Sequence, residues 1–222
     1  MDIDYKKVKN VINYIFSTAV KGNPESVLKA FEDYFYEHEP IMIVGDKKGT
    51  ILKQNIEQRK PKVLVELGGY IGYSSIYMGN LIKNDPSAHF YSVEYDSILV
   101  SVMERVIKFA GLENKITVLN GDLATVLPKL QKDHNITTID LFFIDHIKSA
   151  YVSDFNLADN SKLFANNSVI IADNVIYPGA PEYIKHVNNH PKFDSEIHEF
   201  LMEGHGLSIK DGIMVSTIKS SY

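Results

Sequence analysis

The chain has 222 residues, of which 45% are apolar and 23% are charged, with a formal net charge of −5 at pH 7. This length and composition fit a single globular domain over residues 1–222 with a sizeable core. The negative charge disfavours a nucleic-acid partner, and the lack of cysteine excludes disulfides and thiolate metal sites. The sequence has neither a signal-type apolar segment at its start nor an apolar stretch that could span a bilayer, so we expect a soluble cytosolic protein without a membrane partner.

The first sixty residues are predicted to be helical. Apolar residues recur at helical spacing from Val8 to Phe16. The segment Asn23-Pro24-Glu25 supplies a capping side chain, a proline in the first turn and an early acid for a second helix. A further helix is expected to end near Gln58. We expect residues 1–60 to belong to the same domain and to cover part of its functional site.

From Val63 onward, short apolar runs alternate with helical stretches, which is typical of a parallel sheet covered on both faces. The predicted strands are Val63–Gly68, His89–Glu94, Ile116–Gly121, Asp140–Asp145 and Ser168–Asp173. The predicted helices between them are Tyr73–Lys83, Ser97–Ala110, Leu123–Lys132 and Tyr151–Phe164. Two last strands, Phe193–Phe200 and Gly212–Ile218, are expected to pair antiparallel. This pattern predicts an α/β fold with a doubly wound, seven-stranded, mostly parallel sheet.

Oxygen-bearing side chains follow two of the predicted strands at the points where these strands end. Asp145 follows the apolar run 141–144, and the pair Asp173-Asn174 follows the run 168–172. Three such side chains can aim their oxygens at one point, and hard ligands of this kind suit Mg²⁺, which keeps its other positions for water and substrate. Lys148 follows Asp145 by three residues and would lie near the metal as a proton acceptor.

A glycine turn follows the first predicted strand. Glu66 precedes Gly68, and tyrosines occupy the second and third glycine positions of the dinucleotide-binding pattern, which is therefore not matched. The acid and the spacing of Gly68 and Gly72 instead resemble the first motif of class I methyltransferases, which bind S-adenosylmethionine. Glu94, at the end of the next strand, is placed to accept hydrogen bonds from both hydroxyls of a ribose.

Each of these features also has a simpler structural explanation. A glycine after a strand is often only a tight connection, and acids at strand ends commonly cap helices or, as for Glu94, are solvated. Ser74 can simply cap a helix. Most lysines in a helical turn are solvated, and this is the alternative explanation for Lys148. The combination of the glycine turn, the acid at the next strand end and the three oxygen donors favours a reaction centre over these alternatives.

Five segments of the chain resemble the corresponding motifs of the catechol O-methyltransferases. They are residues 23–28, 44–49, 65–74, 143–148 and 172–179, and the resemblance extends over nearly the whole chain. These enzymes belong to the cation-dependent class I S-adenosylmethionine O-methyltransferases. The resemblance therefore implies a Rossmann-like class I methyltransferase fold with extra N-terminal helices, and Mg²⁺-dependent transfer of a methyl group from S-adenosylmethionine to a hydroxyl of a catechol.

The resemblance also implies roles for individual residues. Asp145, Asp173 and Asn174 would hold the metal, and Lys148 would be the general base. Lys148 and Asn174 would also contact the substrate, whose second hydroxyl would bind Glu203. The residues that would contact the cofactor are Met42, Val44, Glu66, Gly68, Tyr70, Ser74, Glu94 and Asp145.

The chain departs from the mammalian members of this family around the expected substrate ring and adenine. Those enzymes carry tryptophans there, whereas this chain has none, and Pro40 and Ile147 stand at two of the positions. Leu123 stands where a serine would contact adenine, and two extra residues follow Glu203 before Asp211. We expect cofactor and metal binding to persist because their polar ligands are present, and we leave ring preference and regiochemistry open.

Two alternatives to the methylation of a small catechol remain. One is a cation-dependent O-methyltransferase for another vicinal-dihydroxy aromatic, such as a caffeoyl ester. The other is a non-catalytic S-adenosylmethionine-binding protein, which would not need a base such as Lys148 beside a metal. The acidic balance and the lack of a basic, aromatic-rich surface argue against a nucleic-acid methyltransferase. We expect a monomer that acts on a small molecule.

Overall fold

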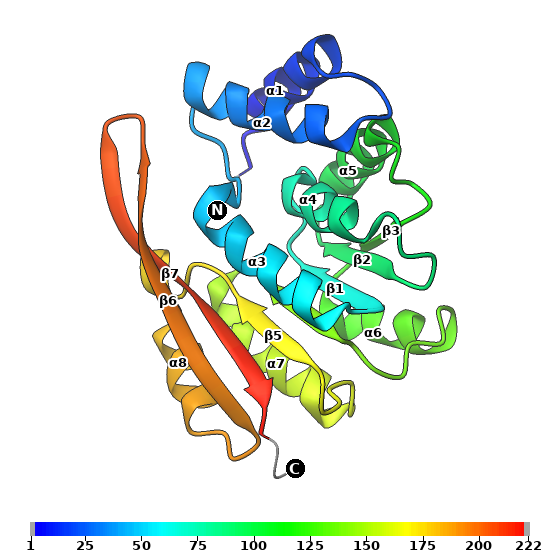
Figure 1. Cartoon of the computed structure of the whole chain (residues 1–222), viewed down its shortest axis with the longest axis vertical. Coiled ribbons are helices and arrows are strands. Elements are labelled where there is room, and N and C mark those ends of the chain that lie inside the picture. The colour runs from blue at the N-terminus through cyan, green and yellow to red at the C-terminus, as the bar shows by residue number, and fades with distance from the viewer. Residues whose placement is uncertain (1–2, 220–222) are drawn as a thin grey trace.

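The computed structural model describes residues 3–219, which form one sheet between two layers of helices (Figure 1). The sheet has seven strands in the order β3-β2-β1-β4-β5-β7-β6, in which β7 pairs antiparallel with β5 and β6 and the other neighbours are parallel. The strands are β1 (Val63–Leu67), β2 (His89–Glu94), β3 (Ile116–Asn120), β4 (Leu141–Ile144), β5 (Val169–Ala172), β6 (Phe193–Gly204) and β7 (Leu207–Ile218). The predicted doubly wound, mostly parallel sheet is confirmed.

Helices cover both faces of this sheet. They are α1 (Tyr5–Thr18), α2 (Pro24–Glu37), α3 (Gly45–Arg59), α4 (Tyr73–Ile82), α5 (Ser97–Ala110), α6 (Leu123–Lys132), α7 (Tyr151–Asn160) and α8 (Pro181–Asn188). One core joins α1 to α5 with strand residues that include Leu64 and Phe143, and a second core joins α6 to α8 with residues that include Val65 and Phe142. Successive strand residues thus enter opposite cores, as the pleat of a strand requires.

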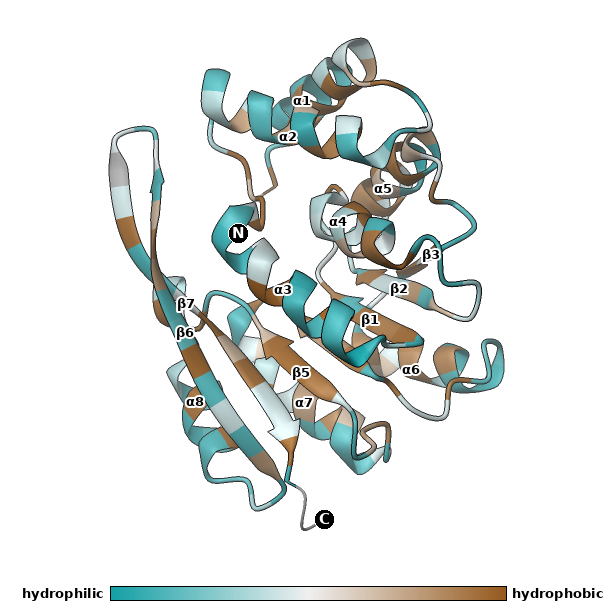
Figure 2. Ribbon diagram, in the orientation of Figure 1, coloured by the Kyte–Doolittle hydropathy of each residue, from teal (hydrophilic) through white to brown (hydrophobic). Residues whose placement is uncertain are grey.

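The central strands are buried on both faces. Every residue of β4 and β5 is buried, which explains why their sequences are continuously apolar rather than alternating. Figure 2 shows β1 and β5 as hydrophobic strands and α3 as a mostly hydrophilic helix. Helix α3 buries Lys48, Gly49, Leu52 and Ile56 and exposes most of its other residues.

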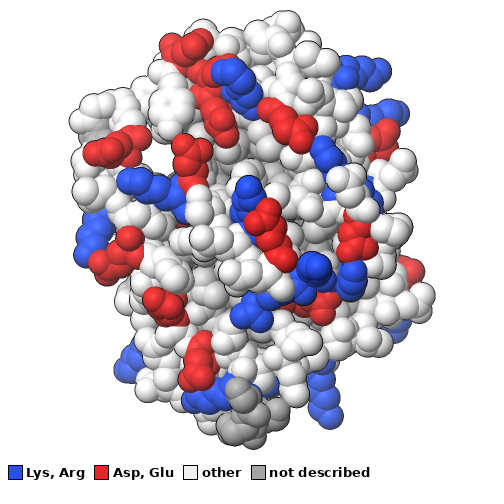
Figure 3. All heavy atoms as spheres, viewed as in Figure 1, with Lys and Arg blue, Asp and Glu red and all other residues white. Residues whose placement is uncertain are grey.

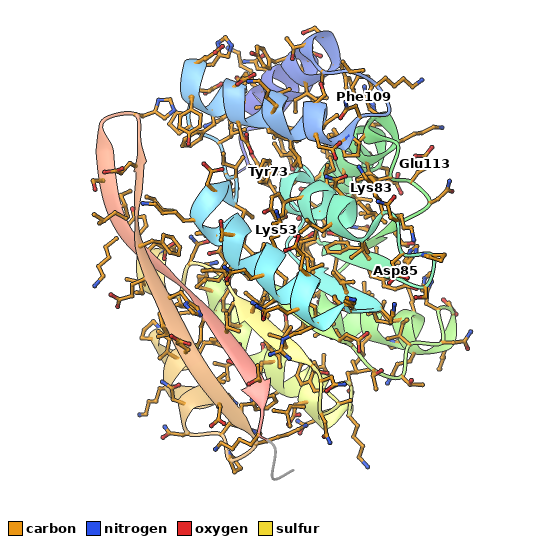
Figure 4. The ribbon with its side chains drawn as sticks, viewed as in Figure 1. Lys53, Tyr73, Lys83, Asp85, Phe109 and Glu113 are labelled. Carbon is orange, nitrogen blue, oxygen red and sulfur yellow. The ribbon has the colours of Figure 1, made fainter. Side chains whose placement is uncertain are left out.

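The N-terminal helices pack against the helices that cover the sheet. Helix α2 begins where Asn23 accepts a hydrogen bond of 3.0 Å from the backbone three residues later, as its sequence predicted. The hydroxyl of Tyr73 in α4 donates to Glu32 at 2.7 Å. Asn80 of α4 and Lys83, which follows the helix, donate to Glu25 at 3.1 and 2.9 Å, so polar contacts join α2 to α4 and the segment after it (Tyr73 and Lys83 are labelled in Figure 4).

The last two strands are longer than the sequence indicated. We predicted Phe193–Phe200 and Gly212–Ile218, whereas β6 continues to Gly204. His205 and Gly206 then form a two-residue turn in which both have positive φ, as tight hairpin turns require. The tip of this hairpin extends past the neighbouring strands toward α2 (Figure 1). Its residues are partly exposed, so they lack the continuous apolar pattern that identified the central strands.

Helix α7 ends earlier than predicted. We expected it to reach Phe164, but it ends at Asn160, and Lys162 adopts a left-handed φ of 57° that stops the helix. Leu163 and Phe164 are nevertheless buried in the second core, so their apolar side chains continued the helical pattern in the sequence without belonging to the helix.

Charged side chains are mixed over the surface. The face in Figure 3 carries acidic and basic residues side by side, without a continuous basic field. Within residues 3–219, each helix is too short or too polar to cross a bilayer.

Candidate active site

The predicted oxygen donors meet at the carboxyl ends of β4 and β5. The parallel register pairs Ile144 with Ala172, so Asp145 and Asp173, which follow these residues, leave neighbouring strands at the same edge of the sheet. The backbone N–H of Asp173 still donates to the carbonyl of Ile144 at 2.9 Å. Asn174 then adopts a left-handed φ of 53°, a conformation that asparagine tolerates better than most residues, and turns its side chain back to this edge.

The ammonium group of Lys148 marks the point on which these donors converge. Its nitrogen lies 3.2 Å from Asp145 Oδ1 and 3.4 Å from both Asn174 Oδ1 and the carbonyl oxygen of Asp173. Lys148 reaches this point because the chain leaves β4 and enters a short 3₁₀ turn, Lys148–Ala150, before α7. The structure therefore brings together the four residues that we predicted as metal ligands and base.

This donor set fits an oxygen-seeking divalent cation. Two carboxylates and an amide oxygen are hard ligands of the kind that Mg²⁺ takes. The Asp145 carboxylate and the Asn174 amide oxygen already contact the ammonium group of Lys148, whereas the Asp173 carboxylate contacts that of Lys48. Across residues 3–219, no three side chains of histidine, cysteine, aspartate or glutamate gather as a metal cluster. A metal at this edge would therefore need the amide oxygen of Asn174 as well as the carboxylates of Asp145 and Asp173.

The buried hydroxyl of Tyr151 joins Lys148 to the end of β5. It accepts a hydrogen bond from the ammonium group of Lys148 and donates one of 3.0 Å to the carbonyl of Asp173. Burial, followed by the nearby carboxylates, raises the pKa of Tyr151 well above its ordinary value, so the hydroxyl keeps its proton. The ring of Tyr151 stacks on His146, whose Nε2 lies 2.7 Å from Asp154.

Two further charged residues enter the site from distant parts of the chain, and we predicted neither. Lys48 in α3 lies 2.6 Å from Asp173 Oδ1 and 3.1 Å from Asp211 Oδ2, and all three residues are buried. Asp211 in β7 also accepts hydrogen bonds from Asn174 Nδ2 at 2.7 Å and from the N–H of Tyr177 at 2.9 Å. The edge of the sheet therefore carries a connected polar network rather than three separate ligands.

The sequence holds a signal for Lys48 but none for Asp211. Lys48, Leu52 and Ile56 are all buried and spaced four residues apart, so Lys48 belongs to the apolar face of α3. A lysine on such a face needs a buried partner, because an unpaired charge is costly to bury. Asp211 precedes a glycine, a combination that is ordinary in turns and indicates nothing about a site.

The charges of this network are mutually compensating. Burial raises the pKa of the Asp145 carboxyl and repulsion from Asp173 adds to the rise, while the ammonium groups of Lys148 and Lys48 oppose it. Burial acts to lower the pKa of Lys48, but the surrounding carboxylates outweigh it and raise the value. Burial would likewise raise the pKa of Asp211, yet hydrogen bonds and Lys48 hold it below its usual range. When Asp145, whose pKa is raised to about 7, is ionised, three carboxylates against two ammonium groups leave one net negative charge, which a further cation would offset.

A second buried acid, Glu66, lies at the end of β1. Its Oε2 accepts hydrogen bonds from Ser75 at 2.5 Å and Ser92 at 2.6 Å, whereas its Oε1 has no hydrogen-bond partner among the described residues. Burial raises the pKa of Glu66, and the hydroxyls of Ser74, Ser75 and Ser92 oppose that rise. Because a buried carboxylate oxygen without a partner is costly, its presence here indicates a partner that the polypeptide does not supply.

The glycine turn packs β1 against β4 and opens the start of α4. A Cβ atom at Gly68, whose φ is 95°, would lie 2.6 Å from the carbonyl oxygen of Asp145, so only glycine fits there. Gly72 also has a positive φ, and the N-terminus of α4 that follows has no side-chain cap. Its first backbone N–H groups are therefore available to an anion. Gly68 thus allows β1 and the end of β4 to pack closely, and the start of α4 provides the polar backbone groups of the turn.

Glu94 fixes the other side of this turn. Its Oε2 accepts a hydrogen bond from the N–H of Tyr70 and its Oε1 one from the N–H of Asp96, each at 2.9 Å. Glu94 is buried, and burial raises the pKa of its carboxyl although these backbone groups oppose the rise. The alternative of a solvated strand end is therefore wrong. Each carboxylate oxygen has a second lone pair, so Glu94 retains acceptor capacity for hydroxyl groups.

The remaining predicted residues lie outside both the network around Asp173 and the glycine turn with Glu66 and Glu94. Val44 is buried at the start of α3, while Met42 just before it is 56% exposed. Glu203 lies in β6 opposite Ser208 and is exposed. In the part of the chain that the structure describes, no hydrogen bond or ion pair connects Glu203 to the network around Asp173. Leu123, at the position of an expected serine, is buried in the second core.

A family model described as O-methyltransferase matches residues 18–217, which is most of the chain. The chain belongs to the O-methyltransferase family. Among its relatives, the catechol O-methyltransferase of Bos taurus is 36% identical over 188 residues, which are 85% of this chain and 68% of that protein. The catechol O-methyltransferase of Mus musculus is 32% identical over 207 residues, which are 93% of this chain and 77% of that protein. The resemblance found in the sequence is thus confirmed.

Solved structures of other O-methyltransferases share the fold. The crystal structure of the O-methyltransferase from Bacillus cereus in complex with SAH matches with a TM-score of 0.71 over 95% of this chain and 91% of that one, at 18% identity. At this identity the match establishes the fold alone, and it confirms the Rossmann-like methyltransferase architecture for this member of the family.

Proposed function

We propose that this O-methyltransferase transfers a methyl group from S-adenosylmethionine to one hydroxyl of a catechol, and that the transfer requires Mg²⁺. The observation that carries this proposal is that the side chains of Asp145 and Asn174 and the backbone carbonyl of Asp173 converge on the ammonium group of Lys148, beside the glycine turn. The similarity to two catechol O-methyltransferases supports the choice of substrate. We further expect a cytosolic monomer that binds neither nucleic acid nor membrane.

Three polar features around the glycine turn match the parts of S-adenosylmethionine. The unpartnered Oε1 of Glu66 suits the ammonium group of its amino-acid moiety. The uncapped start of α4, next to the buried Ser74, suits its carboxylate, and Glu94 suits the hydroxyls of its ribose. The other residues that we assign to this site are Met42, Val44, Gly68, Tyr70 and Asp145. The complex of the Bacillus cereus enzyme with SAH supports a site for this type of cofactor in the shared fold.

The mechanism follows from the arrangement around Lys148. Mg²⁺ held by Asp145, Asp173 and Asn174 would supply positive charge that favours the ionised form of a catechol hydroxyl. Lys148, as the neutral amine, takes the proton of that hydroxyl. Tyr151 keeps the nitrogen of Lys148 beside the acids through its hydrogen bond. Holding the hydroxyl in line with the methyl group then supplies a large part of the acceleration.

Apolar side chains that flank the charged centre suit a flat ring. Ile147 is 66% exposed and lies between Asp145 and Lys148 in the chain, and Tyr177, three residues after Asn174, is 53% exposed. Large apolar side chains left in solvent next to a polar centre are typical of a binding surface. We propose that these side chains hold the ring in the absence of tryptophan, and that Glu203 binds its second hydroxyl.

The proposal is tested by methyl transfer from S-adenosylmethionine to a panel of small catechols, a caffeoyl ester and a monohydroxy phenol, each with Mg²⁺ and with a chelator. We expect turnover of the vicinal diols with Mg²⁺ only, and none of the phenol. Turnover that survives chelation would refute the metal requirement. Turnover of the caffeoyl ester alone would favour the alternative substrate. Tight cofactor binding without turnover of any diol would favour a non-catalytic binding protein.

A further inference from the structure

We propose that Asp211 and Lys48 are positioning residues of the metal site, because together they fix which atom of Asn174 faces the metal. The inference rests on the Mg²⁺ requirement proposed above. It adds two residues, from α3 and β7, that touch neither substrate nor metal and act through the predicted ligands Asn174 and Asp173.

The orientation of the Asn174 amide follows from the donors around Asp211. Asp211 Oδ2 lies 3.1 Å from the ammonium nitrogen of Lys48 and 2.7 Å from Asn174 Nδ2. An ammonium group only donates, so this oxygen accepts, and the part of Asn174 that faces it must be the NH₂ group. The amide oxygen consequently points to the opposite side, where it lies 3.4 Å from the nitrogen of Lys148. A turned amide would present hydrogens where a cation needs an oxygen.

Asp211 can fix this orientation because it is itself held on both oxygens. Its Oδ1 accepts a hydrogen bond of 2.9 Å from the N–H of Tyr177, so the carboxylate spans the turn that follows Asn174. Asp211 is 0% exposed and pairs in the hairpin with Phe200, whose ring centre lies 5.9 Å from the nitrogen of Lys48. Solvent is thus excluded from the Asp211 carboxylate, which accepts from the NH₂ group of the half-buried Asn174.

Lys48 holds the carboxylate of Asp173, the second predicted metal ligand in this network. Its ammonium nitrogen lies 2.6 Å from Asp173 Oδ1 and 2.9 Å from Asp173 Oδ2, in addition to its contact with Asp211. Two buried carboxylates can lie this close only if a cation between them offsets their repulsion. Helix α3 lies on the same side of the sheet as α4 and α5 (Figure 1), so the N-terminal part of the chain supplies the cation that sets the site.

The substitution Asp211→Asn tests this role with the smallest change in shape. The new amide has one acceptor oxygen in place of the two that accept separately from Tyr177 and Asn174, so its NH₂ group faces one of these donors. If that donor is Asn174, its side chain becomes free to turn. We expect the dissociation constant for Mn²⁺, measured by electron paramagnetic resonance on the full chain, to rise about 10- to 100-fold, which is typical of lost outer-shell contacts. We expect the affinity for S-adenosylmethionine, measured by calorimetry, to stay unchanged.

Asp140→Asn is the matched control. Asp140 accepts hydrogen bonds from the backbone of Lys62 and Val63 at 2.7 and 2.9 Å, at the opposite end of the same sheet. This variant loses the same charge, and its Mn²⁺ affinity should equal that of the wild type. Equal Mn²⁺ affinity of wild type and Asp211→Asn would overturn the inference and leave the metal site standing. A wild-type chain that binds no Mn²⁺ at millimolar concentration would overturn both.

A measurement on the wild type covers the case in which Asp211→Asn does not fold. The side-chain amide protons of Asn174 should exchange with solvent more slowly than those of an exposed asparagine such as Asn10, both before and after Mg²⁺ is added, because the metal takes only the oxygen. Exchange as fast as that of Asn10, or loss of protection when Mg²⁺ binds, would show that Asp211 does not fix the amide and would overturn the inference.

Discussion

The two buried acid groups at the carboxyl edge of the sheet are balanced in different ways. Glu66 is surrounded by hydroxyls, and within the described residues no ammonium group pairs with it and one of its oxygens has no partner. Asp173 lies instead in a network with Asp145 and Asp211, into which Lys48 and Lys148 each bring a positive charge.

The polypeptide supplies no cation to Glu66 among the described residues, whereas Lys48 and Lys148 supply two cations to the network around Asp173. A buried polar atom without a partner costs about 1–3 kcal/mol, so Glu66 lowers the stability of the chain, and the ammonium group of the proposed cofactor would offset this cost. The network around Asp173 is compensated by its two ammonium groups except for one net negative charge, so its geometry can be set before the proposed metal binds. The comparison predicts that changes near Glu66 alter cofactor affinity, whereas changes near Asp173 alter catalysis and metal affinity.

The largest expected effect is that of Lys148→Ala on turnover. Loss of the proton acceptor should lower kcat by about 10²- to 10⁴-fold, the usual contribution of a general base. The affinity for S-adenosylmethionine should stay close to that of the wild type, because Lys148 contacts the network around Asp173 and not Glu66. Lys185→Ala, at an exposed lysine of α8, is the control for loss of a positive charge. Retained turnover in Lys148→Ala would remove this residue as the base.

Glu66→Gln should have the opposite pattern to Lys148→Ala: it should lower the affinity for S-adenosylmethionine and leave kcat nearly unchanged. Loss of a charge-assisted hydrogen bond of about 1.5–3 kcal/mol corresponds to an affinity for S-adenosylmethionine about 10- to 100-fold lower, measured by calorimetry. At saturating cofactor, kcat should change little, since the network around Asp173 is untouched. Affinity equal to that of the wild type would contradict the assignment of the unpartnered oxygen to the cofactor.

The pH dependence of the Tm of Glu66→Gln tests whether ionisation of the buried Glu66 destabilises the folded chain. The folded-state pKa of Glu66 is raised above the ordinary value of 4.5, so its stabilising contribution is full below the unfolded-state pKa and is lost as pH rises through the folded pKa. The side chain at this position in Glu66→Gln cannot ionise, so the Tm of this variant should rise relative to the wild type as pH increases above the ordinary value of 4.5, and should match it more closely at lower pH. Glu57→Gln, at an exposed glutamate of α3, should show no such trend. A pH-independent difference in Tm would contradict the cause assigned to the shift.

The sequence predicted the parts of this edge that are local in the chain. The runs before Asp145 and Asp173 are buried on both faces, so their strands were visible as continuous apolar segments and their ends as ligand positions. The apolar face of α3 indicates that Lys48 needs a buried partner, but that partner, Asp173, lies 125 residues away, and contacts at such separation leave no spacing in the sequence. Asp211 was missed for the same reason, since its partner Asn174 lies 37 residues away. The outer half of the hairpin was missed because its partly exposed residues lack an apolar face.

The smallest expected effect is that of Tyr151→Phe. This variant tests whether the network around Asp173 depends on the hydrogen bonds of the Tyr151 hydroxyl or only on its charges. The variant keeps every charge but removes the hydroxyl that joins Lys148 to the carbonyl of Asp173. We expect the free energy of unfolding, measured with urea, to fall by about 1–3 kcal/mol because the carbonyl loses its partner. We expect kcat to fall about 10-fold or less, with a displaced pH profile, because the nitrogen of Lys148 is held less firmly.

Tyr183→Phe is the matched control for that change. Tyr183 is also fully buried and packs edge-on against Tyr151 with ring centres 5.5 Å apart, but among the described residues its hydroxyl has no hydrogen-bond partner. Its removal should therefore be neutral or stabilising and should leave the pH profile of kcat unchanged. If both variants lose the same stability and the same activity, the hydroxyl of Tyr151 acts only by filling space. The network around Asp173 would then depend on its charges rather than on this hydrogen bond.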